Sequence, residues 1–173
     1  GATAGTTGSQ GAEGMSYLEA NLKTELVAAF EKAGYICWKY PDNARGLKKP
    51  CDLICGIHGQ FVALETKLVK VGTASSKGRW HDKQIVVKYT DVRTNQHTAL
   101  RKAVMAGSFG FVVGAIYDRW DCHRLAYAID YETFLLRPMW TLGDCFSDPF
   151  ARRLPWERGV GWNVDELIAL LTL

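Results

Sequence analysis

The stretch from residue 50 to residue 67 constrains the fold most, because it reads as two short apolar strands joined by a glycine-containing turn. Side chains alternate between the two faces of a strand, so Glu65 and Lys67 point the same way and Thr66 points the opposite way. Asp52 opens the first strand of the pair. Pairing these strands therefore predicts two acids and a lysine clustered at one rim of a sheet.

A helix and a further strand are predicted before this hairpin. Residues 17–33 carry apolar side chains at helical spacing, and Gly34 ends the helix. Ser16 and Glu19 lie three positions apart, which is the spacing of a capping box at a helix start. Residues 35–40 then have the composition of a strand.

The later segments are assigned from their caps, glycines and apolar runs. They are a basic loop over 42–50, a long irregular segment over 68–93, a helix over 95–106 capped by Thr94 and ended by Gly107, strands over 109–117 and 124–129, a short helix from Asp130, irregular structure over 137–162, and a last helix opened by Asn163 or Asp165. The order αβββαβ indicates an α/β protein with a mixed sheet flanked by helices.

A chain of 173 residues is long enough for one compact domain with its own core. Residues 1–14 are rich in Gly, Thr, Ala and Ser, and we interpret them as a cloning remnant or a disordered leader before Met15. Residues 15–173 are then a single domain whose C-terminal extension begins at about residue 137. The sequence carries neither a signal-peptide pattern nor an apolar run of membrane-spanning length, so we expect a cytoplasmic protein.

Five cysteines lie at irregular spacings and form no Cys-x-x-Cys pair. A structural zinc site normally shows paired ligands, so this pattern argues against zinc. We expect reduced thiols, with Cys37 and Cys51 acting as small core residues.

Positive charge is concentrated in the middle of the chain. Residues 39–102 carry thirteen Lys or Arg against five Asp or Glu, whereas the whole chain has a net charge of only +3. The basic segment also contains the two acids and the lysine of the hairpin. Uneven charge is common on protein surfaces, but a basic face beside such acids favours a polyanionic substrate.

Carboxylate oxygens are the ligands that hard divalent cations prefer. Asp52 and Glu65 on adjacent strands are therefore candidate ligands for Mg²⁺, with Mn²⁺ as a substitute. A lysine beside such an ion orients a water or stabilises negative charge on a phosphoryl oxygen, which is the role we expect for Lys67. By themselves Glu65 and Lys67 favour an exposed cross-strand ion pair, because the pattern Glu-x-Lys is short and common, and it is Asp52 at the matching position that favours the metal site.

These residues resemble the signature of the PD-(D/E)xK nuclease superfamily. The signature reads Pro50-Cys51-Asp52 and then Glu65-Thr66-Lys67, with one residue inserted between the proline and the acid. The resemblance covers roughly residues 16–117 and implies a restriction-endonuclease-like core. It also implies an acid on the first helix as a further metal ligand.

The acid on the first helix is Glu19 or Glu25. On an ideal helix Glu19 lies about 45° and Glu25 about 75° from the centre of the apolar stripe, so Glu19 leans closer to the sheet and is preferred. Archaeal-type Holliday-junction resolvases, the branch that the chain resembles most, carry a glutamine on the helix after the hairpin. That resemblance implies a supporting catalytic role for Gln96, whereas His97 is expected to be structural.

Basic residues on the segments that enter and leave the hairpin are predicted to contact DNA phosphates without reading sequence. They are Arg45, Lys48, Lys49, Lys70, Lys77, Arg79 and Lys83. Trp80 lies among them and is either a wedge against a base or, by the usual behaviour of tryptophan, a buried residue.

The resemblance thus implies a Mg²⁺-dependent endonuclease that resolves four-way DNA junctions in recombination and repair. Because a junction is cut at two symmetric points, it also implies a homodimer, with Phe111 and Val113 or the tryptophan-rich tail as candidate interfaces. Two alternatives remain open. One is a restriction- or repair-type nuclease that acts on linear or damaged duplex, and the other is a non-catalytic DNA-binding module.

Overall fold

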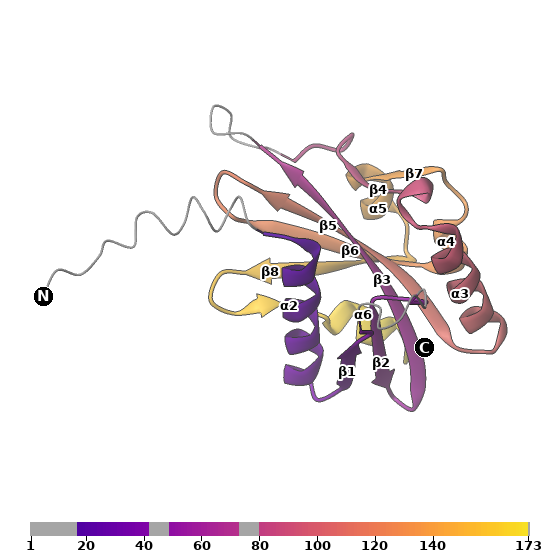
Figure 1. Ribbon diagram of the computed structural model, residues 1–173. Helices are drawn as coiled ribbons and strands as arrows, with labels where there is room; N and C mark the ends of the chain where they lie inside the picture. Colours follow the sequence, from indigo (N-terminus) through magenta and orange to yellow (C-terminus); the bar gives the residue numbers. More distant parts are fainter. Residues whose placement is uncertain (1–16, 42–48, 73–79, 173) are drawn as a thin grey trace, which may run out of the picture.

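The computed structural model describes residues 17–41, 49–72 and 80–172. Its elements follow in the order α2 (Glu19–Lys32), β1 (Ile36–Lys39), β2 (Leu53–Ile57), β3 (Gln60–Val71), β4 (Ile85–Lys88), a 3-10 turn η1 (Tyr89–Asp91), α3 (Thr94–Met105), β5 (Phe109–Asp118), β6 (Arg124–Asp130), α4 (Tyr131–Phe134), β7 (Met139–Thr141), α5 (Leu142–Ser147), β8 (Ala151–Glu157), β9 (Gly161–Trp162) and α6 (Asp165–Leu170). This is a mixed α/β arrangement with helices beside a twisted sheet (Figure 1).

Seven of these strands form one sheet in the order β1-β2-β3-β5-β6-β8-β9. Neighbouring strands are antiparallel except β3 and β5, which are parallel and joined through α3. A parallel connection needs such a crossover, since two parallel strands cannot be linked by a tight turn. The expected mixed sheet with flanking helices is therefore present, but β4 and η1 stand between β3 and α3, so the element order is not the predicted αβββαβ.

The predicted hairpin of β2 and β3 positions the acids. His58 (φ 50°) and Gly59 (φ 75°) make its turn, and the left-handed conformation at the second position suits glycine. Among the described residues, the pairing of β3 with β2 ends at Leu64, although β3 continues to Val71. The last part of β3 therefore presents an open edge on the β2 side.

The two faces of the sheet carry separate cores. The first core contains side chains of α2 and α6 packed on one face, with Leu22, Leu26, Phe30 and Leu167 all inaccessible to solvent. The second core lies on the other face and contains residues of α3, α4, α5 and the small β4–β7 sheet. Two covered faces explain why β5 is an almost continuous apolar run instead of an alternating one.

The small sheet of β4 and β7 approaches β5 very closely at Gly114. A Cβ atom at this position would lie 2.5 Å from Cγ1 of Val86 and 3.2 Å from its carbonyl oxygen. Only glycine leaves room for β4 there. Since Gly114 pairs with Lys67 across the parallel β3–β5 ladder, this contact also places β4 beside the lysine of the signature.

A buried cluster around Arg124 holds α2 against β5 and β6. Nη1 of Arg124 lies 2.5 and 2.9 Å from the two carboxylate oxygens of Glu25. The guanidinium group also lies 4.3 Å from the ring centre of Tyr17 and 4.2 Å from that of Trp156. These contacts fix how far α2 extends along the sheet, and so where its first turn meets β3.

Three expectations about local structure are wrong. Residues 137–162 contain β7, α5, β8 and β9 instead of irregular structure, and the described part of 68–93 contains the end of β3 as well as β4. Short strands are stabilised mainly by their neighbours in the sheet, so their own sequences need not show a clear alternation of polar and apolar residues. For this reason the sequence did not indicate the strands in these two segments. The first helix begins at Glu19, so Glu19 is not the third residue of a capping box. Asn21 instead accepts the amide hydrogen of Leu18, and Ser16 lies outside the described residues.

The candidate dimer residues Phe111 and Val113 are 1% and 0% exposed inside one chain, so they cannot form a subunit interface. In the tail, Trp140 is also fully buried, and its indole Nε1 donates to the carbonyl of Phe134. No helix in the described ranges combines the length and the apolar character that a bilayer crossing requires. Cys37 and Cys51 are buried as expected, and all five cysteines are free.

Candidate active site

Asp52 is held at the open edge of β3 by Thr66. Its Oδ2 accepts hydrogen bonds from the backbone amide and from the hydroxyl of Thr66, each 2.9 Å long. The amide is free for this contact because β2 no longer pairs with β3 at that point. Asp52 is only 3% exposed, so these bonds compensate for the loss of water around its carboxylate.

Two lysines contact the other oxygen of Asp52. Nζ of Lys23, from α2, lies 3.1 Å from Oδ1, and Nζ of Lys49 lies 3.0 Å from the same atom. Burial by itself would raise the pKa of Asp52, but the Thr66 amide, Lys23 and Lys49 together lower it to about 2. Asp52 is therefore ionised throughout the physiological pH range.

Glu65 has the opposite electrostatic environment. It is 0% exposed, and neither of its carboxylate oxygens has a hydrogen-bond partner among the described residues. Burial in the first place, and the charge of Asp52 in the second, raise its pKa to about 8, although Nζ of Lys67 lies 3.4 Å away. Without a bound cation, the Glu65 carboxyl group therefore holds a proton at neutral pH.

Glu19 reaches the same open edge from the first turn of α2. Its Oε1 accepts the backbone amide of Leu68 at 3.3 Å. Leu68 follows Thr66 by two residues, so both amides point to the same side of β3, about 6.6 Å apart. The carboxylates of Asp52 and Glu19 therefore accept hydrogen bonds from two neighbouring outward-facing amides on the same edge of β3, those of Thr66 and Leu68.

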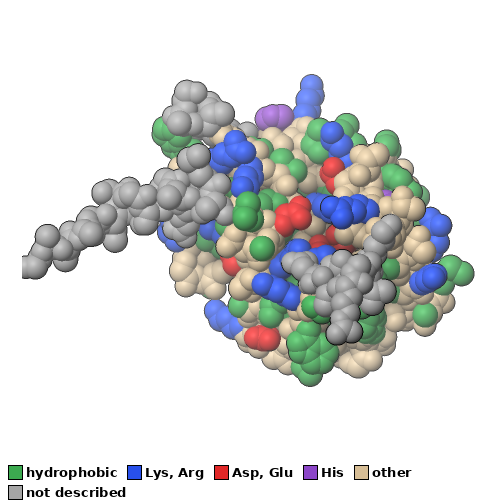
Figure 2. Space-filling model, in the orientation of Figure 1, with side chains coloured by type: hydrophobic (Ala, Val, Ile, Leu, Met, Phe, Trp, Pro, Cys, Tyr) green, Lys and Arg blue, Asp and Glu red, His purple; other side chains and the backbone are tan. Residues whose placement is uncertain are grey.

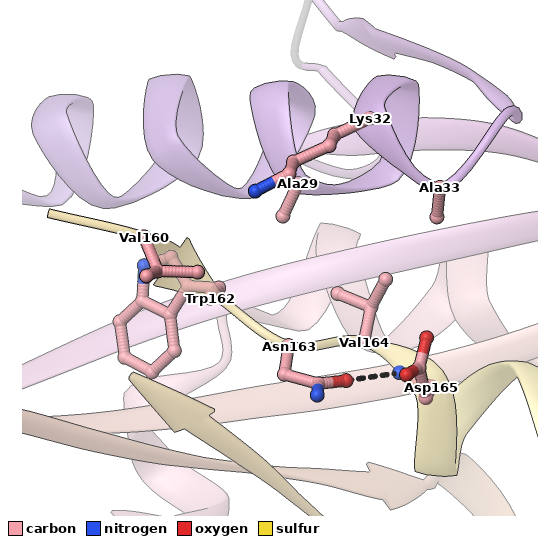
Figure 3. A pocket seen from close by; sticks show the side chains of 8 residues that line it. All are labelled: Ala29, Lys32, Ala33, Val160, Trp162, Asn163, Val164 and Asp165. Carbon is pink, nitrogen blue, oxygen red and sulfur yellow. Dashed lines mark hydrogen bonds between the residues drawn. The ribbon is translucent and has the colours of Figure 1, made fainter. Parts of the chain in front are cut away.

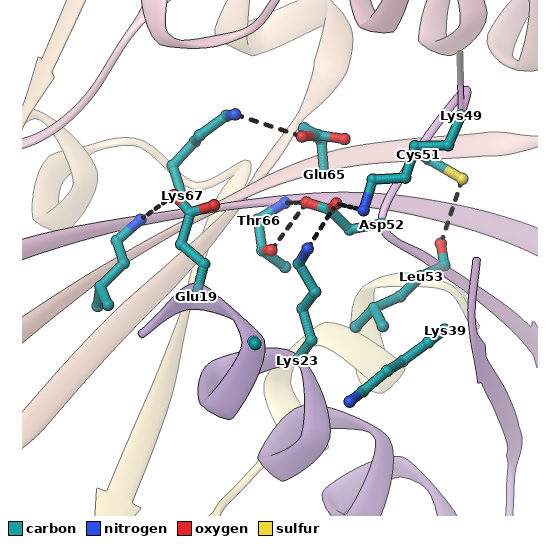
Figure 4. Close-up of polar contacts among 12 residues, drawn as sticks. Glu19, Lys23, Lys39, Lys49, Cys51, Asp52, Leu53, Glu65, Thr66 and Lys67 are labelled. Carbon is teal, nitrogen blue, oxygen red and sulfur yellow. Dashed lines mark hydrogen bonds and ion pairs between the residues drawn. The ribbon is translucent and has the colours of Figure 1, made fainter. Parts of the chain in front are cut away.

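Figure 4 shows how the group is assembled: Glu19 and Lys23 rise from α2, Asp52 precedes β2, and Glu65 and Lys67 extend from β3. On the surface of this side of the molecule, carboxylates lie among lysine and arginine side chains (Figure 2). The structure brings Lys67 to 3.4 Å from Glu65, and Asp52 lies at the same edge of β3 through its bonds to Thr66, whereas the roles predicted for these residues stay predictions.

The donor set fits a hard divalent cation in its chemistry. Carboxylate oxygens are the preferred ligands, and the two oxygens of Glu65 are buried without a partner among the described residues. Within the described ranges, however, no three or more His, Cys, Asp or Glu side chains are arranged as a ready set of ligands. The assignment of Glu19, Asp52 and Glu65 to Mg²⁺ therefore stays a prediction.

Glu25, the alternative helix acid, lies away from this group because its carboxylate binds Arg124 and accepts the hydroxyl of Tyr17 at 2.6 Å. Gln96 is 6% exposed, and its Oε1 accepts the amide of Arg93 at 2.8 Å, which stabilises the start of α3. Its expected supporting role in catalysis stays a prediction. His97 is structural as expected, since its ring nitrogens contact the hydroxyl of Tyr131 and the carbonyl of Tyr89.

The residues predicted to contact DNA are only partly described. Arg45, Lys48, Lys77 and Arg79 lie outside the described residues. Lys70 is half-buried on β3 and Lys83 is exposed, whereas Lys49 contacts Asp52 within the site. Trp80 is half-buried, and its ring stacks on that of His123 at 5.2 Å, which favours the buried interpretation over the wedge.

Lys23 is the site residue that the sequence reasoning missed. It follows Glu19 by four residues, so both side chains lie on the same side of α2, about 40° apart. That spacing was a usable signal once Glu19 had been placed at the site. The pattern of a lysine one turn after an acid is common on exposed helices, however, and carried no information until Asp52 was located beside α2.

A separate cavity of about 230 Å³ lies between the end of α2 and the start of α6. Val160, Trp162 and Val164 line it on one side and Ala29, Lys32 and Ala33 on the other (Figure 3). The carboxamide oxygen of Asn163 accepts the amide of Asp165 at its rim. The residues of the candidate active site do not line this cavity.

The comparisons with known proteins find no matching family and include a distant structural likeness. No protein-family model matches the sequence, and a search of curated proteins gives no match either. Among solved structures, the chain is similar to Hjc from Archaeoglobus fulgidus, described as a Holliday junction resolvase from an archaeal hyperthermophile. The two share 15% identity and a TM-score of 0.40 over 72% of this chain and 97% of the other. A structural likeness this distant does not show the function of this chain.

Proposed function

We propose that this protein is a Mg²⁺-dependent endonuclease with a restriction-endonuclease-like core that resolves four-way DNA junctions. The observation that carries the proposal is the arrangement at the open edge of β3. The carboxylates of Asp52 and Glu19 accept hydrogen bonds there from the backbone amides of Thr66 and Leu68, which β2 leaves unpaired. A third carboxylate, that of Glu65, is buried beside them without a hydrogen-bond partner among the described residues, and Lys67 lies next to it.

Glu19, Asp52 and Glu65 would hold the metal ion. When bound, Mg²⁺ supplies Lewis-acid activation of water and neutralises negative charge on the phosphate. Lys67, 3.4 Å from Glu65, orients the attacking water or stabilises charge on a non-bridging phosphoryl oxygen. Thr66 fixes Asp52 through two hydrogen bonds, so that this carboxylate does not swing away when the substrate enters.

A polyanionic substrate is consistent with the local charge. Lys23, Lys49 and Lys67 place three ammonium groups at the two central acids. Such groups attract a phosphate backbone without selecting a base sequence. The choice of a four-way junction and of a homodimer rests on the resemblance of the signature, and both are part of the proposal.

The test compares the wild type with Asp52→Asn and with Glu31→Gln as a matched control. Asn keeps the size of Asp52 but removes its charge, whereas Glu31 is an exposed acid on α2 outside the site. Each protein is incubated with a four-way junction, a nicked duplex, a flap and a linear duplex, in Mg²⁺ or in EDTA. We expect Asp52→Asn to bind the junction in EDTA and to leave it uncut in Mg²⁺, while Glu31→Gln cuts it like the wild type.

The substrates separate the alternatives. Symmetric nicks in the junction alone support the resolvase, whereas cutting of linear or flap DNA supports a different nuclease of the same superfamily. Undiminished cutting by Asp52→Asn would refute the role of the acid site. Sedimentation of the free and junction-bound protein gives the number of chains, and a single chain on a cut junction would refute the homodimer.

A non-catalytic DNA-binding module is the second candidate, and one observation favours it. Lys23 and Lys49 together already neutralise the charge of Asp52 without any metal. A site neutralised in this way could bind a phosphate backbone and never cleave it. Binding of the junction without cleavage in either Mg²⁺ or Mn²⁺ by the wild type would decide for this candidate.

A further inference from the structure

A cavity of about 380 Å³ lies between the turn η1 and the first half of α3. Two arginines, Arg93 and Arg101, line it, and the hydroxyl-bearing side chains around it are those of Tyr89, Thr90, Thr94 and Thr98. The described residues that line it include neither Asp nor Glu. In the described part of the chain, neither arginine forms an ion pair with a carboxylate. The cavity is therefore cationic.

The floor of this cavity is rigid. His97 is 7% exposed, its ring stacks on Tyr89 at 4.1 Å, and its nitrogens contact Tyr131 and the Tyr89 carbonyl. Arg101 follows His97 by four residues and so lies on the same side of α3. Arg93 is fixed through its backbone, because its amide donates to the side chain of Gln96. Both arginine side chains are exposed, so their guanidinium groups are accessible to a ligand.

The cavity is connected to the candidate active site through α3. Nδ2 of Asn95 donates to the carbonyl of Lys49 at 3.3 Å, and Lys49 contacts Asp52. Thr98 and Arg101 lie about 60° and 120° around the helix from Asn95. A helix with its side chains is about 10–12 Å across, so the cavity is about one helix diameter from the loop that carries Asp52.

We propose that this cavity binds a backbone phosphate of the same DNA molecule, near the bond that is cut. Planar guanidinium groups bind phosphate oxygens through paired hydrogen bonds, and the hydroxyls of Thr90 and Thr94 are further candidate donors. The cavity would hold the DNA in register on the protein, while Asp52, Glu65 and Lys67 act on the scissile phosphate. This inference rests on the proposed DNA substrate, but it concerns binding and not cleavage.

The test uses the double variant Arg93→Gln/Arg101→Gln, and Arg158→Gln is the matched control. Arg158 is an exposed arginine in the β8–β9 turn, which lies at the other end of the molecule from α3 (Figure 1). Junction binding is measured by fluorescence anisotropy in EDTA over a range of KCl concentrations. Each lost phosphate contact should lower the slope of log affinity against log salt by about 0.9, which is about an eightfold loss of affinity per arginine at 0.1 M salt.

The proposal predicts a slope smaller by about 2 for the double variant and an unchanged slope for Arg158→Gln. An unchanged slope in the double variant would overturn the assignment. The readout in EDTA does not depend on cleavage, so failure of the nuclease proposal and failure of this one are distinguishable.

Two further measurements distinguish a contact with the DNA backbone from a site for free phosphate. The conservative variant Arg101→Lys keeps the charge, so in the Arg93→Gln background it should recover about one unit of the salt slope. Titration with inorganic phosphate tests whether the cavity takes a free anion. Phosphate binding that is lost in the double variant, with an unchanged DNA slope, would show a free-phosphate site and overturn the proposal.

Circular dichroism melting establishes that each variant is folded. If the double variant fails to fold, Arg93→Lys/Arg101→Lys replaces it, because lysine keeps the charge but removes the paired donors of guanidinium. The junction should then bind more weakly with an unchanged salt slope, and an affinity equal to that of the wild type would overturn the assignment.

Discussion

The buried carboxyl group of Glu65 makes the stability of the metal-free protein depend on pH. The unfolded chain ionises this group above its ordinary pKa of 4.5, whereas the folded protein keeps the proton until about pH 8. The folded state therefore binds more protons within this window. Glu65 accordingly contributes stability that is fully present below pH 4.5 and is lost as the pH rises to about 8.

The size of the effect follows from the two pKa values. A difference between 4.5 and about 8 corresponds to about 5 kcal/mol in the free energy of unfolding, at 1.36 kcal/mol for each pH unit. Domains of this kind are stable by about 5–15 kcal/mol in total, so the change is a large share of the stability. Asp52 does not obscure it, since its pKa of about 2 lies below the window.

The assay is urea unfolding in EDTA at several pH values between 5 and 9, with the wild type, Glu65→Gln and the control Glu31→Gln. Glutamine keeps the size of the side chain and cannot ionise. We expect the wild type and Glu31→Gln to lose several kcal/mol between pH 5 and 8.5, and Glu65→Gln to lose much less. Mg²⁺ should stabilise the wild type more at pH 8.5 than at pH 5, because ligands have to be deprotonated. Equal pH dependence in Glu65→Gln and the wild type would refute the reasoning.

Two further predictions concern the packing that positions the site. Gly114→Ala should lower the free energy of unfolding by about 1–3 kcal/mol, because the added Cβ would lie 2.5 Å from a methyl group of Val86. Gly56→Ala is the control, since a Cβ there would have no atom within 4 Å, and it should change the free energy of unfolding by less than about 0.5 kcal/mol. Arg124→Leu should cost about 3 kcal/mol by leaving Glu25 partly buried without its partner, and Glu25→Leu added to it should restore part of that loss. Urea unfolding at pH 7 measures the free energy of unfolding of each variant. Equal losses of stability in Gly114→Ala and Gly56→Ala would contradict the first prediction. A double variant less stable than Arg124→Leu would contradict the second.

The sequence by itself determined the local elements that carry the acids. The alternation of side chains in the hairpin placed Glu65 and Lys67 on one face, and the apolar stripe of α2 directed Glu19 toward the sheet. Apolar runs and terminal glycines also located α3 and β5 to within one residue of their observed bounds. These features depend on neighbours a few residues away, which is why a single sequence specifies them.

Only the tertiary structure decided which charged side chains of those elements come into contact. Lys23 is far from Asp52 in the chain, and only the docking of α2 on β3 brings its ammonium group to the carboxylate. The ion pair with Arg124, which follows Glu25 by 99 residues in the sequence, holds the Glu25 carboxylate away from the site. The strands β7 and β8 likewise exist through pairing with β4 and β6, which are not their neighbours in sequence, and not through their own periodicity. Long-range contacts of this kind depend on the whole arrangement of the sheet, and for that reason no local pattern predicted them.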